Sequence, residues 1–169
     1  MTKADKIVIR PQMIKDANDF FRILTNGRFE FFPVNVSSLE AEKRLLRSNR
    51  NSFKTGESYN FSILLNNKVI GAIGVLPERN RPYNAEIGYF LDKDQHGKGY
   101  ALQAVRLAET YVLKHLPVIH RLYAVIVVEN LPSIRVVEKA GYEKEGMLRK
   151  YLLVGDKFLD ACIFSKILR

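Results

Sequence analysis

The sequence predicts an α/β fold, in which a mixed central sheet carries helices on its faces. Three observations predict it. Segments that alternate or are rich in β-branched and aromatic residues, typical of strands, are interleaved with segments whose apolar residues recur at helical spacing. Read along the chain, these segments number about seven strands and four helices. The length of 169 residues fits one domain with a sizeable core, so we expect a single domain over residues 1–169.

The first half of the chain is expected to run strand, helix, helix, strand, strand. Pro11 stops a strand over residues 7–11, and Asn26-Gly27 ends a helix over residues 16–24. Ser37 and Glu40 fit a capping box that opens a helix reaching about Phe53. Between these helices, Phe29, Phe31 and Phe32 form an aromatic loop that is either a local hydrophobic plug or one wall of a substrate cleft. Strands over residues 59–65 and 68–75 flank Asn66-Asn67, a two-residue hairpin signal.

The second half alternates strands and helices before it ends in two strands. We expect a longer turn over residues 77–82, which carries a proline at each end, and then a strand over residues 83–91. Asn130 can cap a helix that ends at Gly141, and Gly155-Asp156 can turn between the last two strands. The remaining expected elements are a helix from about Gly97 to His115 and strands over residues 121–128, 142–148 and 157–168.

Composition is that of a soluble globular protein, with 47% hydrophobic and 27% charged residues. No apolar run is long enough to span a membrane, and the N-terminus resembles no secretory signal. A single cysteine, Cys162, excludes an internal disulfide, so we expect a reducing, cytoplasmic setting. The formal net charge of +9 suits anionic partners such as nucleotides, nucleic acid or ribosome-associated proteins, although solubility alone also accounts for it. Three scattered histidines show no ligand spacing, so no metal is expected.

The segment Gly97-Lys98-Gly99 lies between a strand and a helix. The first N–H groups of a helix have no partner within it, and the helix dipole places roughly half a positive charge there. Because glycines also let the backbone approach a ligand closely, this order can form a seat for a phosphate or pyrophosphate. The P-loop spacing is absent, and Leu102 stands where the dinucleotide fingerprint has its third glycine. On the glycines alone, a plain tight turn fits equally well.

Five motifs occur in order on the expected strands and helices. They are Ala85-Glu86-Ile87-Gly88-Tyr89, Gly97-Lys98-Gly99-Tyr100-Ala101, Asn130-x-x-Ser133, Glu138-Lys139-x-Gly141-Tyr142 and Glu145-Gly146-x-Leu148-Arg149. In these motifs the chain resembles the GNAT acyltransferases (Gcn5-related N-acetyltransferases), and most of all the RimJ/RimL type, which acetylates N-terminal amines of ribosomal proteins. The resemblance covers nearly the whole chain. It implies a mostly antiparallel sheet splayed in the middle, and acetyl-CoA as the acetyl donor.

The resemblance also implies which residues hold acetyl-CoA. Backbone amides from Gly97 through Lys98, Gly99, Tyr100 and Ala101 to Leu102 would hold the pyrophosphate. The pantetheine arm would enter the splayed sheet beside Phe90 and Leu91 and would meet Asn130 and Ser133. Lys98 either adds charge near a phosphate or is simply exposed, and Asn130 can also serve only as a helix cap. His96 departs from the family, which often has Gln or Arg there, so its side-chain contact stays open.

Acetyl transfer to an amine needs a neutral nitrogen, a polarised thioester carbonyl and a proton for the leaving thiolate. By resemblance, Glu86 is the candidate base; the alternative is that it faces solvent or pairs with an arginine. Many family members place a tyrosine proton donor where this chain has Val137, so Ser133 is the candidate donor, with Tyr142 and Tyr151 as substitutes. Ser133 can also bond only to the backbone of its helix. A backbone N–H near Leu91 would meet the oxyanion.

The expected function is therefore N-acetyl transfer from acetyl-CoA to a primary amine by direct attack in a ternary complex. The preferred acceptor is a protein N-terminal α-amine of ribosomal-protein type. One alternative is a small amine, such as a polyamine, an aminoglycoside or an aminoacyl compound. Alternatives of another class are a basic RNA- or ribosome-binding module and a CoA-binding sensor without catalysis. The sequence leaves monomer and homodimer open.

Overall fold

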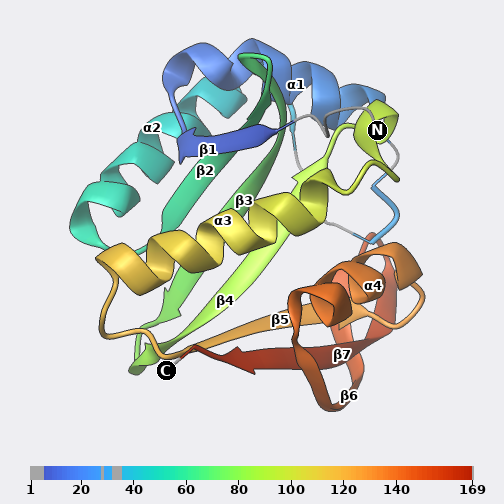
Figure 1. Ribbon diagram of the computed structural model, residues 1–169. Helices are drawn as coiled ribbons and strands as arrows, with labels where there is room; N and C mark the ends of the chain where they lie inside the picture. Colours follow the sequence, from blue (N-terminus) through green and yellow to red (C-terminus); the bar gives the residue numbers. More distant parts are fainter. Residues whose placement is uncertain (1–5, 28, 32–35, 169) are drawn as a thin grey trace, which may run out of the picture.

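The computed structural model describes residues 6–27, 29–31 and 36–168 (Figure 1). Seven strands form one sheet in the order β1-β2-β3-β4-β5-β7-β6. The strands are β1 (Ile7–Pro11), β2 (Tyr59–Leu65), β3 (Lys68–Glu78), β4 (Arg81–Leu91), β5 (Arg121–Val127), β6 (Glu143–Val154) and β7 (Lys157–Ile167). The helices are α1 (Ala17–Asn26), α2 (Leu39–Thr55), α3 (Tyr100–His115) and α4 (Leu131–Ala140), with short 3-10 turns η1 (Ile14–Asp16) and η2 (Lys93–Gln95). Among the described residues only β4 and β5 pair in parallel, which confirms the expected mixed, mostly antiparallel sheet of seven strands.

Helices cover both faces of the sheet (Figure 1). On one face, α3 buries Ala104, Val105, Ala108 and Val112 completely against the main core. On the other face, α1 and α2 enclose a second core that includes Phe20, Ile23 and Leu46 with side chains of β2 and β3. Alternation along each strand supplies both cores, because successive side chains of a strand point to opposite faces. The two layers hold β4, the strand that leads into the glycine turn, from both sides.

Three local predictions differ from the structure. Ser38, not Ser37, caps α2, because its hydroxyl accepts from the Ala41 amide at 3.1 Å and so reaches the third residue of the helix. The expected longer turn over residues 77–82 is a tight hairpin, and Pro77 pairs with Ala85 within the ladder. A register shift after Pro77 accommodates the proline, as bulges commonly do. β6 extends to Val154, beyond the predicted 148, also through register shifts.

Other turn predictions are confirmed. Asn66 and Asn67 both have positive φ, 49° and 65°, as a tight hairpin turn requires. Asn130 caps α4 and Gly141 ends it with φ 88°.

Within the part of the chain that the structure describes, no helix is long and apolar enough to cross a membrane, and no cluster of His, Cys, Asp and Glu could hold a metal ion. Phe32 lies outside the described residues.

The sheet opens between β4 and β5. Their parallel ladder joins three pairs only, from Asn84↔Arg121 to Glu86↔Tyr123. Beyond Glu86, β4 continues to Leu91 along β3, while β5 continues to Val127 along β7. The two strands therefore stop pairing midway, which confirms the splayed sheet. In the part of the chain that the structure describes, one edge of β4 beyond Glu86 has no strand partner.

Candidate active site

The backbone of β4 presents polar groups to the opening. The amide nitrogen of Asp92 lies 2.8 Å from the carbonyl oxygen of Ile70, so that pair bonds toward β3. Since such bonds alternate along an antiparallel ladder, Phe90 also bonds toward β3, and the N–H and C=O groups of Tyr89 and Leu91 point the other way. These groups face the gap that β5 has left. The Leu91 carbonyl oxygen lies 3.1 Å from Nε2 of His96, so the N–H of Leu91 and both groups of Tyr89 are those with which the amides of a ligand can pair.

The glycine turn lies at the end of this gap. Gly97 and Gly99 have φ values of 74° and 79°, and a Cβ built on either would meet no atom within 4 Å. Gly99 is the N-cap residue of α3 and has no side chain with which to cap it. The turn thus combines open space with the amide end of a 16-residue helix, the arrangement that suits a bound phosphate.

A cavity of about 590 Å³ joins the opening to the glycine turn. Its walls come from the end of β4, the turn, the first residues of α3, residues of α4 as far as Lys139 and the loop after α1. Of the residues predicted to bind the cofactor, the following line it: Phe90, Leu91, His96, Gly97, Gly99, Tyr100, Ala101, Leu102, Asn130 and Ser133. Phe29 and Phe31 also line it, in keeping with the interpretation of their loop as a cleft wall.

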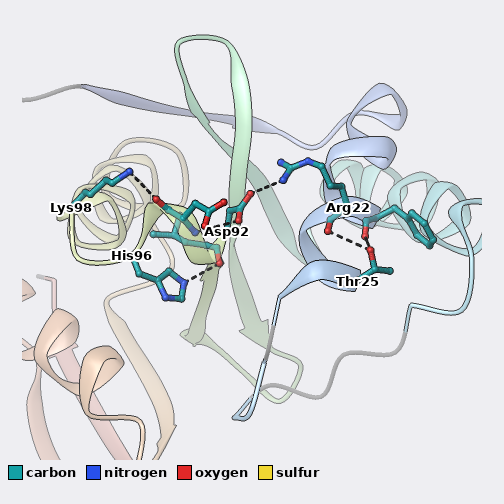
Figure 2. Close-up of polar contacts among 8 residues, drawn as sticks. Arg22, Thr25, Asp92, His96 and Lys98 are labelled. Atoms are coloured by element: carbon teal, nitrogen blue, oxygen red, sulfur yellow. Dashed lines mark hydrogen bonds and ion pairs between the residues drawn. The ribbon is translucent and has the colours of Figure 1, made fainter.

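Lys98 and Glu86 do not line this cavity. The Lys98 ammonium donates to the carbonyl oxygen of Asp94 at 2.8 Å and to Oε1 of Gln95 at 3.2 Å, so it is bonded back onto the preceding turn (Figure 2). Its predicted role as a phosphate ligand stays a prediction that would require those bonds to be exchanged.

Polar contacts fix the glycine turn and α1 to the end of β4 (Figure 2). Nε2 of His96 lies 3.1 Å from the carbonyl oxygen of Leu91. Asp92, the residue that follows Leu91, is buried, and its carboxylate accepts from Arg22 of α1 at 2.8 Å. Through these contacts, α1 and the glycine turn are both anchored to the end of β4.

Glu86 lies on the face of β4 that points away from α3. Its neighbours Ala85 and Ile87 are buried in the α3 core, so Glu86, Gly88 and Phe90 occupy the opposite face. Burial raises the pKa of the Glu86 carboxyl, and the nearby charge of Glu78 raises it further. A raised carboxyl pKa is common among groups that exchange protons in catalysis.

The surroundings of Glu86 leave room for a reactant. Among the described residues, no hydrogen bond or ion pair engages its carboxylate. A Cβ built on Gly88, two residues along the same face, would meet no atom within 4 Å. Tyr123 lies opposite Glu86 in the ladder, and burial, followed by the charges of Glu86 and Glu78, raises its pKa to about 12. Glu86 thus lies where the pairing of β4 with β5 ends, and the space above Gly88 on the same face is open.

Ser133 lies across the opening, in the first turn of α4. Its amide donates to Oδ1 of Asn130 at 3.3 Å, which confirms Asn130 as a helix cap. The Ser133 carbonyl oxygen accepts from the hydroxyl of Tyr89 at 3.1 Å. Tyr142, a substitute donor, is buried away from the cavity lining, and its hydroxyl has no hydrogen-bond partner among the described residues. Burial, and then the charge of Glu109, raises the pKa of Tyr142.

Tyr89, Arg135 and Lys139 are among the cavity residues to which the sequence alone assigns no role. Tyr89 belongs to a motif but is given no function by it, and Arg135 and Lys139 of α4 also line the cavity. Two features of the sequence could have identified Arg135 and Lys139. They are four residues apart, which places them on one face of the helix, and they follow Ser133 by two and six residues.

Comparisons with known proteins agree with this geometry. A family model described as "Acetyltransferase (GNAT) domain" matches residues 6–143. The chain is 32% identical to "Probable N-acetyltransferase YjcK" of Bacillus subtilis (strain 168), over 95% of this chain and 93% of the relative. It is 27% identical to "Ribosomal-protein-serine acetyltransferase" of Escherichia coli (strain K12), over 81% of this chain and 76% of the relative.

Among solved structures, the chain superposes with a TM-score of 0.89 on RimL, a ribosomal L7/L12 alpha-N-protein acetyltransferase, in complex with coenzyme A. The match covers 99% of this chain and 96% of that one, at 18% identity. At this identity the likeness is one of fold.

Proposed function

The chain belongs to the GNAT acetyltransferase family, and on that premise we propose that it transfers the acetyl group of acetyl-CoA to the N-terminal α-amine of a polypeptide, of the ribosomal-protein type. Two similar proteins support the acceptor class. The one from Escherichia coli is named a ribosomal-protein-serine acetyltransferase, and the structural neighbour is named a ribosomal L7/L12 alpha-N-protein acetyltransferase. The net charge of +9 also favours electrostatic association with a polyanion such as the ribosome.

One observation carries the proposal: the β4–β5 ladder ends at Glu86, and the gap leads through one cavity to the glycine turn. This shape fits acetyl-CoA. The long pantetheine arm, which contains amides, would lie along the backbone of Tyr89 and Leu91, and the pyrophosphate would meet the first amides of α3. Arg135 and Lys139 add positive charge to the same cavity, as a ligand with several phosphates requires.

When bound, acetyl-CoA supplies a thioester whose carbonyl carbon accepts the amine nitrogen while the bond to sulfur breaks. Glu86 receives the proton that the amine loses, directly or through a water molecule. The N–H of Leu91, which points into the opening, donates to the carbonyl oxygen as negative charge develops on it. Ser133 supplies a proton to the departing sulfur. These three roles are our proposal.

The proposed base matches an α-amine better than a lysine side chain. An α-amine with a pKa near 8 is roughly one-tenth neutral at pH 7, whereas an amine with a pKa near 10.4 is neutral in well under about one molecule in a thousand. A single partly buried carboxylate with a raised pKa is a modest base, so it suffices for the first and is poorly suited to the second.

A competition among acceptors tests the proposal. Purified protein and acetyl-CoA are incubated with peptides that have a free N-terminus, with the same peptides blocked at the N-terminus but carrying a lysine, and with spermidine. We expect mass spectrometry to find acetylation of the free N-terminus and a loss of rate in Glu86→Gln. Preferential acetylation of spermidine or of the internal lysine would assign the enzyme to another acceptor class.

A further inference from the structure

We infer that Tyr89 is a positioning residue that braces β4 against the first turn of α4 and thereby sets where Ser133 lies. This inference rests on the proposed function, because it concerns the placement of the proposed proton donor. The brace joins residues 44 apart in sequence, and its hydrogen bond measures 3.1 Å from the Tyr89 hydroxyl to the Ser133 carbonyl oxygen.

The position of Tyr89 in the sheet makes such a brace necessary. Strand pairing between β4 and β5 ends at Glu86, three residues earlier, so no ladder fixes the separation of the two halves of the sheet at Tyr89. α4 follows β5 in the chain and packs against both β5 and α3. A side-chain bond from β4 to α4 therefore links the two walls of the cavity where backbone bonds no longer do.

The other end of α4 has its own anchor. The Lys166 ammonium donates to the carbonyl oxygen of Ala140 at 2.7 Å and pairs with the buried Glu109 of α3 at 2.9 Å. These contacts hold the C-terminus of α4 to α3 and β7. Tyr89 holds the N-terminal end, where Ser133 and the capping Asn130 lie.

Tyr89 is suited to a fixed mechanical role. Burial raises its pKa to about 12, so its hydroxyl keeps its proton and stays a donor at neutral pH. Its single proton is directed to a main-chain carbonyl, which any residue at position 133 would also provide. A Ser133→Ala variant therefore keeps the brace while it removes the hydroxyl that the brace positions.

This separation permits a double-mutant test. The variants are Tyr89→Phe, Ser133→Ala and the pair, with Tyr111→Phe as a control in the aromatic cluster of α3, outside the cavity. The readouts are the Kd for CoA from calorimetry and kcat at saturating acetyl-CoA. We expect Tyr89→Phe to weaken CoA binding about fivefold, the change typical of one net hydrogen bond.

The effect on kcat is diagnostic. We expect Tyr89→Phe to lower kcat about tenfold when Ser133 is present and less than about twofold in the Ser133→Ala background, because coupled residues are not additive. Equal losses in both backgrounds would overturn the inference, as would a Tyr89→Phe enzyme that matches Tyr111→Phe in Kd and kcat. A wild-type protein that binds no CoA would instead overturn the proposed function, and this role of Tyr89 with it.

Discussion

Nε2 of His96 lies 3.1 Å from the carbonyl oxygen of Leu91, and the amide nitrogen of Asp92, in the same peptide unit, lies 2.8 Å from the carbonyl oxygen of Ile70. Because a carbonyl only accepts, Nε2 carries the proton. The last peptide unit of β4 is thus held from both sides. Since the N–H of Leu91 precedes this unit directly, His96 helps to fix the direction of the proposed oxyanion donor.

The first prediction concerns His96. Removing its ring in His96→Ala frees the Leu91 carbonyl, and we expect CoA affinity and kcat each to fall about fivefold, as for the loss of one net hydrogen bond. His96→Gln keeps an N–H donor and should recover part of both losses. His115→Ala, which alters a histidine at the far end of α3, serves as the control. Wild-type values in His96→Ala would show that the contact is dispensable.

A second prediction concerns the empty space beside Glu86. Gly88 has an ordinary strand conformation, and a Cβ there meets nothing, so Gly88→Val should fold with a melting temperature close to that of wild type. Activity should fall by about a hundredfold, because the side chain would displace a reactant by an ångström or more. Gly146→Val, at another open strand position, should retain activity. An active Gly88→Val enzyme would place the acceptor elsewhere.

A third prediction concerns the pH dependence of kcat/KM. The charge of Glu78 helps to raise the pKa of Glu86, so Glu78→Gln should lower that pKa. If Glu86 must be ionised to accept a proton, the acid limb of the profile then moves to lower pH. The rate at the plateau should change little. If the acid limb moved to higher pH or did not move, Glu86 would not be the group whose ionisation controls kcat/KM.

A fourth prediction concerns stability. The pKa of Glu86 in the folded state is raised above its value in the unfolded state, which is near 4.3. The neutral carboxyl therefore contributes stability that is fully present below the unfolded pKa and is lost as the pH rises through the folded pKa. Replacing the carboxylate by a neutral amide in Glu86→Gln should therefore raise the melting temperature at pH 7 to 8. The advantage should vanish below about pH 4. A lower melting temperature at neutral pH would reveal a stabilising partner for the carboxylate.

Local signals in the sequence predicted most of the fold. Asn66-Asn67, Asn130 and Gly141 each act within their own turn, so their roles follow from conformational preference alone. The cap at Ser38 was missed by one residue because Glu40, three residues after Ser37, fits a capping box, whereas Ser38 caps through the Ala41 amide without such a partner. The turn at residues 77–82 was mispredicted because the ladder with β4 outweighs the reluctance of proline to join a strand.

The candidate site was predictable only where backbone groups do the binding. The strand, glycine turn and helix fixed its location, since their order alone creates the amide seat. Side-chain roles depended on contacts between distant segments. To decide which face of the sheet Glu86 lies on, one must know which residues form the two cores. The hydrogen bond from Tyr89 to Ser133 joins residues 44 apart, so neither feature could follow from a local sequence pattern.

The most direct test of the account is the thermal stabilisation of the wild-type protein by acetyl-CoA, measured beside Gly99→Glu and Gly155→Glu. Both glycines have positive φ and open surroundings, so the two substitutions carry similar strain, but only Gly99 belongs to the proposed phosphate seat. At 100 times its Kd, a ligand stabilises by about 2.7 kcal/mol, which corresponds to roughly 5–10 °C for a chain of this size. We predict this shift in wild type and Gly155→Glu, and its loss in Gly99→Glu. No shift in wild type, or an equal shift in Gly99→Glu, would contradict the claim that acetyl-CoA binds at the glycine turn.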